Sequence, residues 1–223
     1  TAYTLAELGN AYDLGLASSF KTAFEKLGGK VIAENFPTNQ ADFTSYITNA
    51  KSNGAQAIFA PTSISYAQLI IEAAATQGLK IPLYAGDTWD SNVILAAAKG
   101  KDVQVNVTTF YQEGGNAEFD AGVKEYINSN PTILANNGGD DTVSAVTAMG
   151  YDAYFTALEA IKAAGSTDPK AVNEALWGVK YDGVTGHIEF NETGDAKRDA
   201  AYVKTANTET GAWDFVAVQK VEG

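Results

Sequence analysis

The first half of the chain repeats one pattern, in which a short apolar run is followed by an amphipathic stretch that ends at glycine. The runs are bounded by Gly, Pro, Asn or Asp and predict five strands. They are Ala2–Glu7, Lys30–Phe36, Gln56–Ala60, Pro82–Gly86 and Val103–Phe110. Strands separated by crossover helices must be parallel, and right-handed crossovers cover both faces of an open sheet. The pattern therefore predicts an α/β fold with an open parallel sheet.

Four helices are expected between these strands. They are Tyr12–Leu27, a helix from Ala41–Asp42 to Asn53–Gly54, Ser65–Gln77 and Ser91–Lys99. The first helix carries an apolar stripe at helical spacing, which predicts a buried face. The stripe consists of Leu16, Phe20, Phe24 and Leu27. The second helix is expected to hold Asp42 in its first turn, where a negative charge stabilises the helix dipole, and to bury Phe43, Ile47 and Ala50.

After Phe110 the pattern becomes mostly helical. The expected helices are Glu118–Ser129, Val143–Ala164 and Pro169–Trp177, and the expected strands are Tyr181–Phe190, Ala200–Ala206 and Trp213–Val221. Turn-rich segments between these strands predict antiparallel ribbon. We therefore expect three parts: a ligand-binding lobe over 1–110, a helical segment of another, incomplete lobe over 111–180, and return strands to the ligand-binding lobe over 181–223.

Composition removes several function classes. The net charge of −12 opposes binding to nucleic-acid phosphates. With no Cys and one His, thiol catalysis and thiolate metal sites are excluded, and neither a nucleotide-binding glycine motif nor a G-x-S-x-G motif is present. His187 is interpreted as a structural residue on a strand. We expect no cofactor, no metal and no enzymatic activity.

In open parallel sheets, ligands bind beyond the carboxyl ends of the strands. Three strand-to-helix turns here are small, hydroxyl-bearing, aromatic or acidic, and they contain the candidate ligand-binding residues Tyr12, Thr62, Ser63, Ser65, Asp87 and Trp89. Asp87 ends an apolar strand, where its carboxylate could meet a ligand cation or could simply cap a turn. The candidate residues in the other two turns could likewise be ordinary helix-capping, turn or core residues.

These turns, in register with four further segments, resemble the branched-chain amino-acid (Leu/Ile/Val) binding proteins of bacterial ABC transporters, which have the type I periplasmic-binding-protein fold. The segments that carry the resemblance are Gly9–Gly15, Ala41–Thr44, Gly86–Ser91, Gly150–Ala153 and Gly183–Gly186, the last leading to Phe190 and Gly194–Asp195. The resemblance runs through nearly the whole chain. It begins at about the first crossover between the family's two lobes, so that roughly the first third of the pattern lies outside this sequence.

The resemblance implies an exported, non-enzymatic protein that captures a free branched-chain or similar amino acid for an ABC permease. The location would be the periplasm or the cell surface, with a lipid anchor an option for the full-length form. Asp87 would accept the ligand ammonium, where the best-known members have Glu, and Tyr12 would line the side-chain pocket. The Thr62–Ser65 turn would line it too, although family members carry tyrosines there.

Two alternatives remain at this stage. One is the effector core of a LacI-like regulator, although no helix-turn-helix or basic segment accompanies it, and the other is an α/β enzyme without a recognisable base or nucleophile.

The apolar residues of the predicted helix Val143–Ala164 need to be covered by other elements on more than one side. Large exposed apolar patches mark interfaces, so we expect this chain alone to self-associate and to bind amino acids more weakly than a chain with the first lobe restored.

Overall fold

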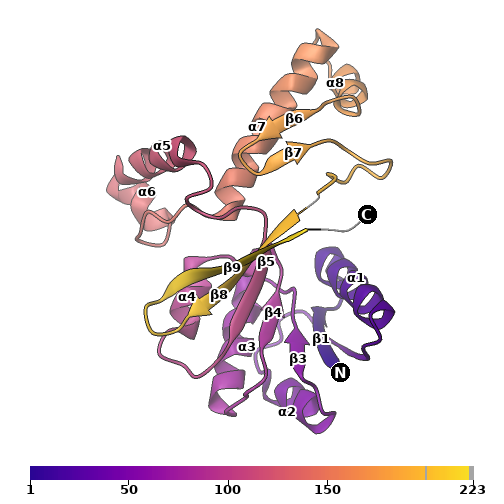
Figure 1. Cartoon of the computed structure of the whole chain (residues 1–223), viewed down its shortest axis with the longest axis vertical. Coiled ribbons are helices and arrows are strands. Elements are labelled where there is room, and N and C mark those ends of the chain that lie inside the picture. The colour runs from indigo at the N-terminus through magenta and orange to yellow at the C-terminus, as the bar shows by residue number, and fades with distance from the viewer. Residues whose placement is uncertain (199, 221–223) are drawn as a thin grey trace. The chain divides into compact units, whose positions relative to one another are not determined.

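The computed structural model describes residues 1–198 and 200–220, and its contacts divide the chain into two units (Figure 1). Unit 1 contains Thr1–Thr109 and Val203–Ala217, and unit 2 contains Phe110–Tyr202 with the C-terminal residues from Val218. The segment 181–202, which the sequence analysis grouped with the return strands, lies in unit 2. No helix among the described residues has the length and apolar character that crossing a membrane requires.

Unit 1 is built on a seven-stranded sheet with the order β2-β1-β3-β4-β5-β8-β9. The strands are β1 Ala2–Glu7, β2 Val31–Phe36, β3 Ala57–Phe59, β4 Leu83–Ala85, β5 Val105–Thr109, β8 Ala200–Asn207 and β9 Ala212–Lys220. The first five are parallel, with Thr4 opposite both Ala33 and Phe59. This arrangement confirms the predicted α/β fold with a mostly parallel sheet.

The last two strands of the sheet, β8 and β9, are neighbours joined by only four residues. Parallel strands need a much longer crossover, so this pair is antiparallel, as predicted. The predicted last strand also included Val221, which lies outside the described residues.

Four helices connect the parallel strands, as predicted: α1 Ala11–Lys26, α2 Thr44–Ser52, α3 Ile64–Thr76 and α4 Asn92–Ala98. The Asn10 side chain caps α1 by accepting hydrogen bonds from the backbone N–H groups of Tyr12 and Asp13. Such caps satisfy N–H groups that have no partner within the helix. The chain leaves α4 through Gly100, whose φ of 73° is readily adopted by glycine.

Two details of the predicted helices are wrong. Leu27 does not belong to the buried stripe of α1: it is the C-cap residue and is 86% exposed, whereas Asp13 and Ala17 are buried and Phe20 stacks on Phe59. Asp42 precedes α2 instead of lying in its first turn. Its carboxylate accepts the backbone N–H of Thr44 at 2.8 Å, which sets the start of the helix. Both errors concern helix ends, where local hydrogen bonds override periodicity.

The core of unit 1 is continuous across the sheet and its helices. Leu5, Ile58 and Leu83 of the strands and Ile70 and Ile94 of the helices are all fully or almost fully buried. The predicted buried face of α2, formed by Phe43, Ile47 and Ala50, belongs to the same cluster. This packing holds the carboxyl ends of the strands in place, and the candidate site residues lie in the turns that follow these ends.

Unit 2 is mostly helical, as predicted, and holds a separate two-stranded sheet. Its elements are α5 Ala117–Asn128, α6 Pro131–Asn136, α7 Ala145–Ala164, α8 Pro169–Leu176, β6 Tyr181–Gly183 and β7 Gly186–Ile188. Helix α6 was not predicted, although Asn130 caps it and Pro131 occupies its first turn, both ordinary helix-start signals.

The single strand predicted over Tyr181–Phe190 is wrong, because these residues form the antiparallel hairpin of β6 and β7. The buried Asp152 carboxylate of α7 explains the turn. It accepts the backbone N–H of Val184 at 2.9 Å and that of Thr185 at 2.7 Å, and also the Thr185 hydroxyl at 2.6 Å. A side chain at Gly183 would collide with this carboxylate. Two segments that carry the family resemblance therefore meet to hold the hairpin.

Candidate functional site

The predicted site residues follow three neighbouring strands of unit 1. The carboxyl ends of β1, β3 and β4 meet at one edge of the sheet because these strands are parallel and adjacent. Tyr12 lies in the first turn of α1, Ser63 and Ser65 at the start of α3, and Asp87 in the short 3-10 helix η1, Asp87–Trp89. Sequence segments 75 residues apart are thereby brought to one place.

Tyr12 and Asp87 are directly hydrogen-bonded. The Tyr12 hydroxyl donates to Asp87 Oδ1 at 2.6 Å, and the Tyr12 side chain remains 41% exposed. Burial of the hydroxyl, with the neighbouring Asp87 carboxylate, raises the pKa of Tyr12 far above its ordinary range. Tyr12 is therefore a donor at neutral pH, and it fixes one carboxylate oxygen while the other oxygen of half-buried Asp87 remains for a further donor.

Gly86 makes this approach of α1 to the end of β4 possible. A Cβ atom at this position would lie 2.7 Å from the Tyr12 hydroxyl oxygen and 2.9 Å from Leu16 Cδ2. Both distances are shorter than real Cβ contacts, so a side chain here would push Tyr12 away from Asp87. The glycine before Asp87 thus serves the close approach of two segments.

Buried hydrogen bonds connect the turn after β3, which contains Thr62, to the turn after β4, which contains Trp89. The Thr62 carbonyl oxygen accepts the Trp89 indole N–H at 2.9 Å and the Thr88 hydroxyl at 3.1 Å. The side chains of Thr62 and Trp89 are fully buried, and Thr62 Oγ1 has no hydrogen-bond partner among the described residues. Because neither side chain reaches the surface of unit 1, we expect both to support the site instead of touching a ligand.

The two predicted serines lie at the surface of the same edge. The Ser63 and Ser65 hydroxyl oxygens are 3.0 Å apart and hydrogen-bonded to each other. Ser65 is exposed and Ser63 half-buried. They place two small hydroxyl groups where Asp87 and Tyr12 present a carboxylate and an aromatic ring, so the edge offers both polar and apolar contacts.

Glu7 and Tyr66 are additional polar residues at this edge that the sequence analysis did not select. Tyr66 donates to Glu7 Oε1 at 3.0 Å, and its hydroxyl accepts the backbone N–H of Asn39 at 3.0 Å. The hydrogen bond from Tyr66 lowers the pKa of Glu7. Glu7 could have been selected from the sequence because it is the last residue of β1, and ligands bind beyond the carboxyl ends of the strands in such sheets.

His187 lies on β7 in unit 2, with Nδ1 2.5 Å from Asp182 Oδ1 of the paired strand. The structural role of His187 stays a prediction. Within the part of the chain that the structure describes, no group of three or more His, Cys, Asp or Glu side chains is arranged to hold a metal ion.

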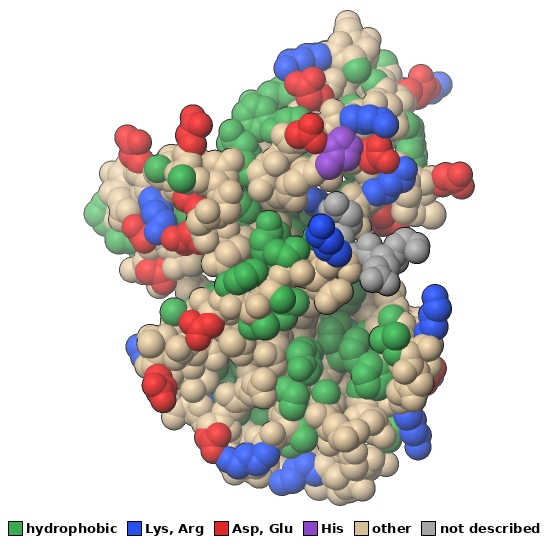
Figure 2. Space-filling model, in the orientation of Figure 1, with side chains coloured by type: hydrophobic (Ala, Val, Ile, Leu, Met, Phe, Trp, Pro, Cys, Tyr) green, Lys and Arg blue, Asp and Glu red, His purple; other side chains and the backbone are tan. Residues whose placement is uncertain are grey.

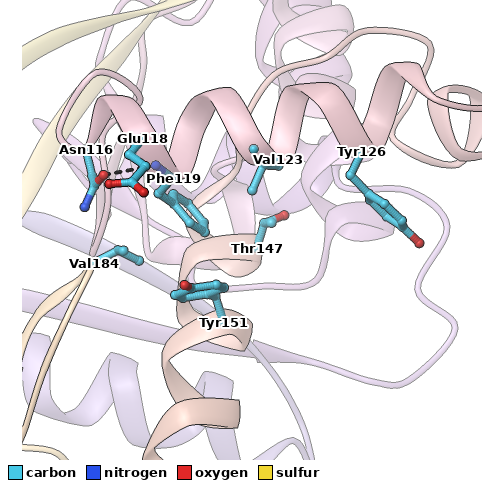
Figure 3. Close-up of a pocket in the computed structure, with 9 residues that line it drawn as sticks. Asn116, Glu118, Phe119, Val123, Tyr126, Thr147, Tyr151 and Val184 are labelled. Carbon is cyan, nitrogen blue, oxygen red and sulfur yellow. Dashed lines mark hydrogen bonds between the residues drawn. The ribbon is translucent and has the colours of Figure 1, made fainter.

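Unit 2 has a groove of its own, with a volume of about 640 Å³. Figure 3 shows Phe119 and Val123 of α5 on the side of Tyr151 and Thr147 of α7, with Tyr126 further along α5 and Val184 of the hairpin turn at the other end. The groove is mainly apolar, and several large side chains near it are exposed: Tyr126 by 66%, Val146 by 59% and Tyr154 by 62%. Hydrophobic side chains also gather over α7 on the face drawn in Figure 2. The predicted exposed apolar surface of the long helix is therefore present.

Comparison with known proteins decides the family. A model described as periplasmic binding protein matches residues 1–211. The chain belongs to this family. A Leu/Ile/Val-binding protein homolog from Brucella suis is 31% identical over 192 residues, which cover 83% of this chain and 48% of the relative. The same figures hold for the homolog from Brucella melitensis. This chain spans about half the length of the curated relatives it matches.

Solved structures agree with this assignment. A leucine-binding protein from Thermotoga maritima, with 27% sequence identity and a TM-score of 0.80, aligns with 98% of this chain and 60% of its own. A branched-chain amino-acid binding protein from Streptococcus pneumoniae in complex with isoleucine aligns with 99% of this chain and 59% of its own, at 20% identity and a TM-score of 0.71. The type I periplasmic-binding-protein fold and the predicted family resemblance are thereby confirmed.

Proposed function

We propose that this chain carries the ammonium-binding lobe of a solute-binding protein that captures a free branched-chain or similar amino acid. The observation that carries the proposal is the Tyr12–Asp87 pair, in which a partly exposed carboxylate is oriented by one hydrogen bond at the ligand-binding edge of the sheet. Its second oxygen can accept an ammonium N–H. The aliphatic side chain of the amino acid would then lie against the Tyr12 ring.

Two relatives described above are Leu/Ile/Val-binding protein homologs, and two similar structures are a leucine-binding protein and an isoleucine complex. These proteins support the ligand class. A charged pair shielded from water stabilises a complex, and loss of one partner leaves the other charge unpaired. We therefore assign the ammonium contact to Asp87 and further contacts to Tyr12, Ser63 and Ser65, with Thr62 and Trp89 behind them.

The proposed physiological role is delivery of the amino acid to an ABC permease outside the cytoplasm, by binding and release without catalysis. The family supports an extracytoplasmic location. We place the protein in the periplasm or at the cell surface, where a lipid anchor on the full-length form would suit it. We also propose that this chain alone self-associates through the exposed apolar surface of α5 and α7, because such patches are rare on monomers. The net charge of −12 suits a small-molecule partner better than nucleic acid.

The test separates the ammonium from the rest of the ligand. Leucine and isocaproate share one carbon skeleton and a carboxylate, but isocaproate lacks the ammonium. NMR titration of the chain should show tighter binding of leucine than of isocaproate. In Asp87→Ala the leucine affinity should fall at least ~100-fold, from roughly 3 kcal/mol of lost pairing, while isocaproate binding changes little.

Asp102→Ala is the matched control, because Asp102 is an exposed carboxylate of unit 1 whose ion pair is with the surface residue Lys80. It should leave both affinities as they are. Equal binding of leucine by the parent chain and by Asp87→Ala would remove Asp87 from the site and overturn the proposal.

A further inference from the structure

A buried ion pair lies directly behind the candidate ligand-binding turn. Asp90 follows η1, and its backbone N–H donates to the carbonyl oxygen of Asp87 at 2.9 Å. The Asp90 carboxylate points into unit 1, where Lys204 Nζ lies 3.0 Å from Oδ2 and 3.2 Å from Oδ1. The Thr109 hydroxyl also donates to Oδ2, at 2.8 Å. All three side chains are nearly inaccessible to solvent.

Two of the three residues lie on the strands by which the chain leaves unit 1 and returns to it. Thr109 is the last residue of β5 and of the first stretch of unit 1, and Lys204 is the second residue after the chain returns to unit 1 at Val203. One carboxylate is therefore bound by both strands through which the chain leaves and re-enters this unit. The same residue is hydrogen-bonded to Asp87.

Stability alone does not explain this arrangement. Removing two charges from water is costly, and a well-packed apolar pair is often as stable as a buried ion pair. In every other ion pair among residues 1–198 and 200–220, at least one partner retains a third or more of its side-chain exposure. The buried pair thus links the residue that follows η1 to the strand by which the chain returns to unit 1. Buried polar groups of this kind can specify a unique geometry.

We propose that Asp90, Lys204 and Thr109 are positioning residues, which hold the turn Asp87–Trp89 at a fixed place against β5 and β8. The network would keep the Asp87 carboxylate oriented before ligand arrives. It would also couple occupancy of Asp87 to the two strands that lead into unit 2. This inference rests on the proposed function for its ligand, but the fixed turn itself can be tested without one.

The main variant is the neutral pair Asp90→Asn with Lys204→Met, since Lys204→Met alone would leave a buried charge unpaired and could prevent folding. Asparagine keeps the shape of aspartate and can still accept from Thr109. The matched control is Glu72→Gln with Lys101→Met, which neutralises a partly exposed ion pair of the same unit. Amide hydrogen exchange is measured on the whole chain without ligand.

In the neutral pair, the amides of Trp89 and Asp90 should exchange at least ~10-fold faster, beyond any change in the amides of β1. In the control variant, the rate of amide exchange should change equally at the turn and in β1. Leucine affinity should also fall ~10-fold in the neutral pair, although Tyr12 and Asp87 are intact. Equal acceleration at the turn and in β1 would show a merely structural pair and overturn the inference. A parent chain that binds no amino acid would overturn the proposed function alone, because the exchange comparison needs no ligand.

Discussion

Units 1 and 2 use similar amphipathic helices but bury them to different extents. In unit 1 every crossover helix packs on a seven-stranded sheet, and one buried cluster runs from Tyr3 to Ala206. In unit 2 the main buried cluster is small and consists of Tyr111, Phe119, Val143, Ala145 and Ala148, while α6 and α8 have no fully buried residue. An apolar face alone does not bury a helix, because burial requires an opposing layer.

The largest expected effect is the loss of stability when a buried side chain in the core of unit 1 is truncated. Ile70→Ala removes a fully buried side chain of α3 and should lower the free energy of unfolding by about 2–5 kcal/mol, through lost burial and the cavity left behind. Tyr126→Ala, on an exposed face of unit 2, should change it by no more than about 0.5 kcal/mol. Denaturant unfolding monitored by amide exchange in each unit would measure both. A larger loss in Tyr126→Ala would show that this exposed face of unit 2 contributes to the free energy of unfolding, contrary to the comparison.

The exposed face of α7 should determine the association state. Val146→Lys with Tyr154→Lys places two like charges on this face and should raise the dissociation constant for self-association at least ~10-fold. Val93→Lys on α4 is the control, since it adds a charge at a partly exposed apolar residue of unit 1. Sedimentation and light scattering would compare the chains. A parent chain that is monomeric at all concentrations contradicts the proposal.

A smaller effect is expected at Tyr12. Tyr12→Ala removes both the ring and the hydroxyl that orients Asp87, and should weaken leucine binding by ~10-fold, about 1.4 kcal/mol. The melting temperature should change little, because the side chain is 41% exposed. Calorimetric melting and NMR titration of the same sample separate these two effects. If stability falls while affinity holds, Tyr12 belongs to the core instead of the site.

Much of unit 1 could be predicted from the sequence, because most local signals agreed with the final packing. The apolar runs that became β1 to β5 lie where they were predicted, and the predicted helix start at Ser91 agrees with its position as the N-cap of α4. Helix ends were less predictable. Leu27 fits the apolar spacing of α1, but the helix ends at Lys26 and the Leu27 side chain is exposed.

Unit 2 was predicted less well, since its shape depends on contacts distant in sequence. The residues of β6 and β7 read as one strand until Asp152, some 30 residues earlier, binds the turn at Val184 and Thr185. In the candidate site, Asp87 and Tyr12 were identified from their positions after strands. The full burial of Trp89 and the carboxylate network of Asp90 could not be read from turn composition, because both depend on tertiary contacts.

The most direct test of the central claim is residue-resolved NMR mapping of leucine on the whole chain, which distinguishes the edge of unit 1 from the groove of unit 2. The account predicts that the largest saturable amide shifts occur at Tyr12, Ser63, Ser65 and Asp87, and that they disappear in Asp87→Ala. Largest shifts at Phe119, Val123 and Tyr151, or shifts that persist unchanged in Asp87→Ala, would contradict it.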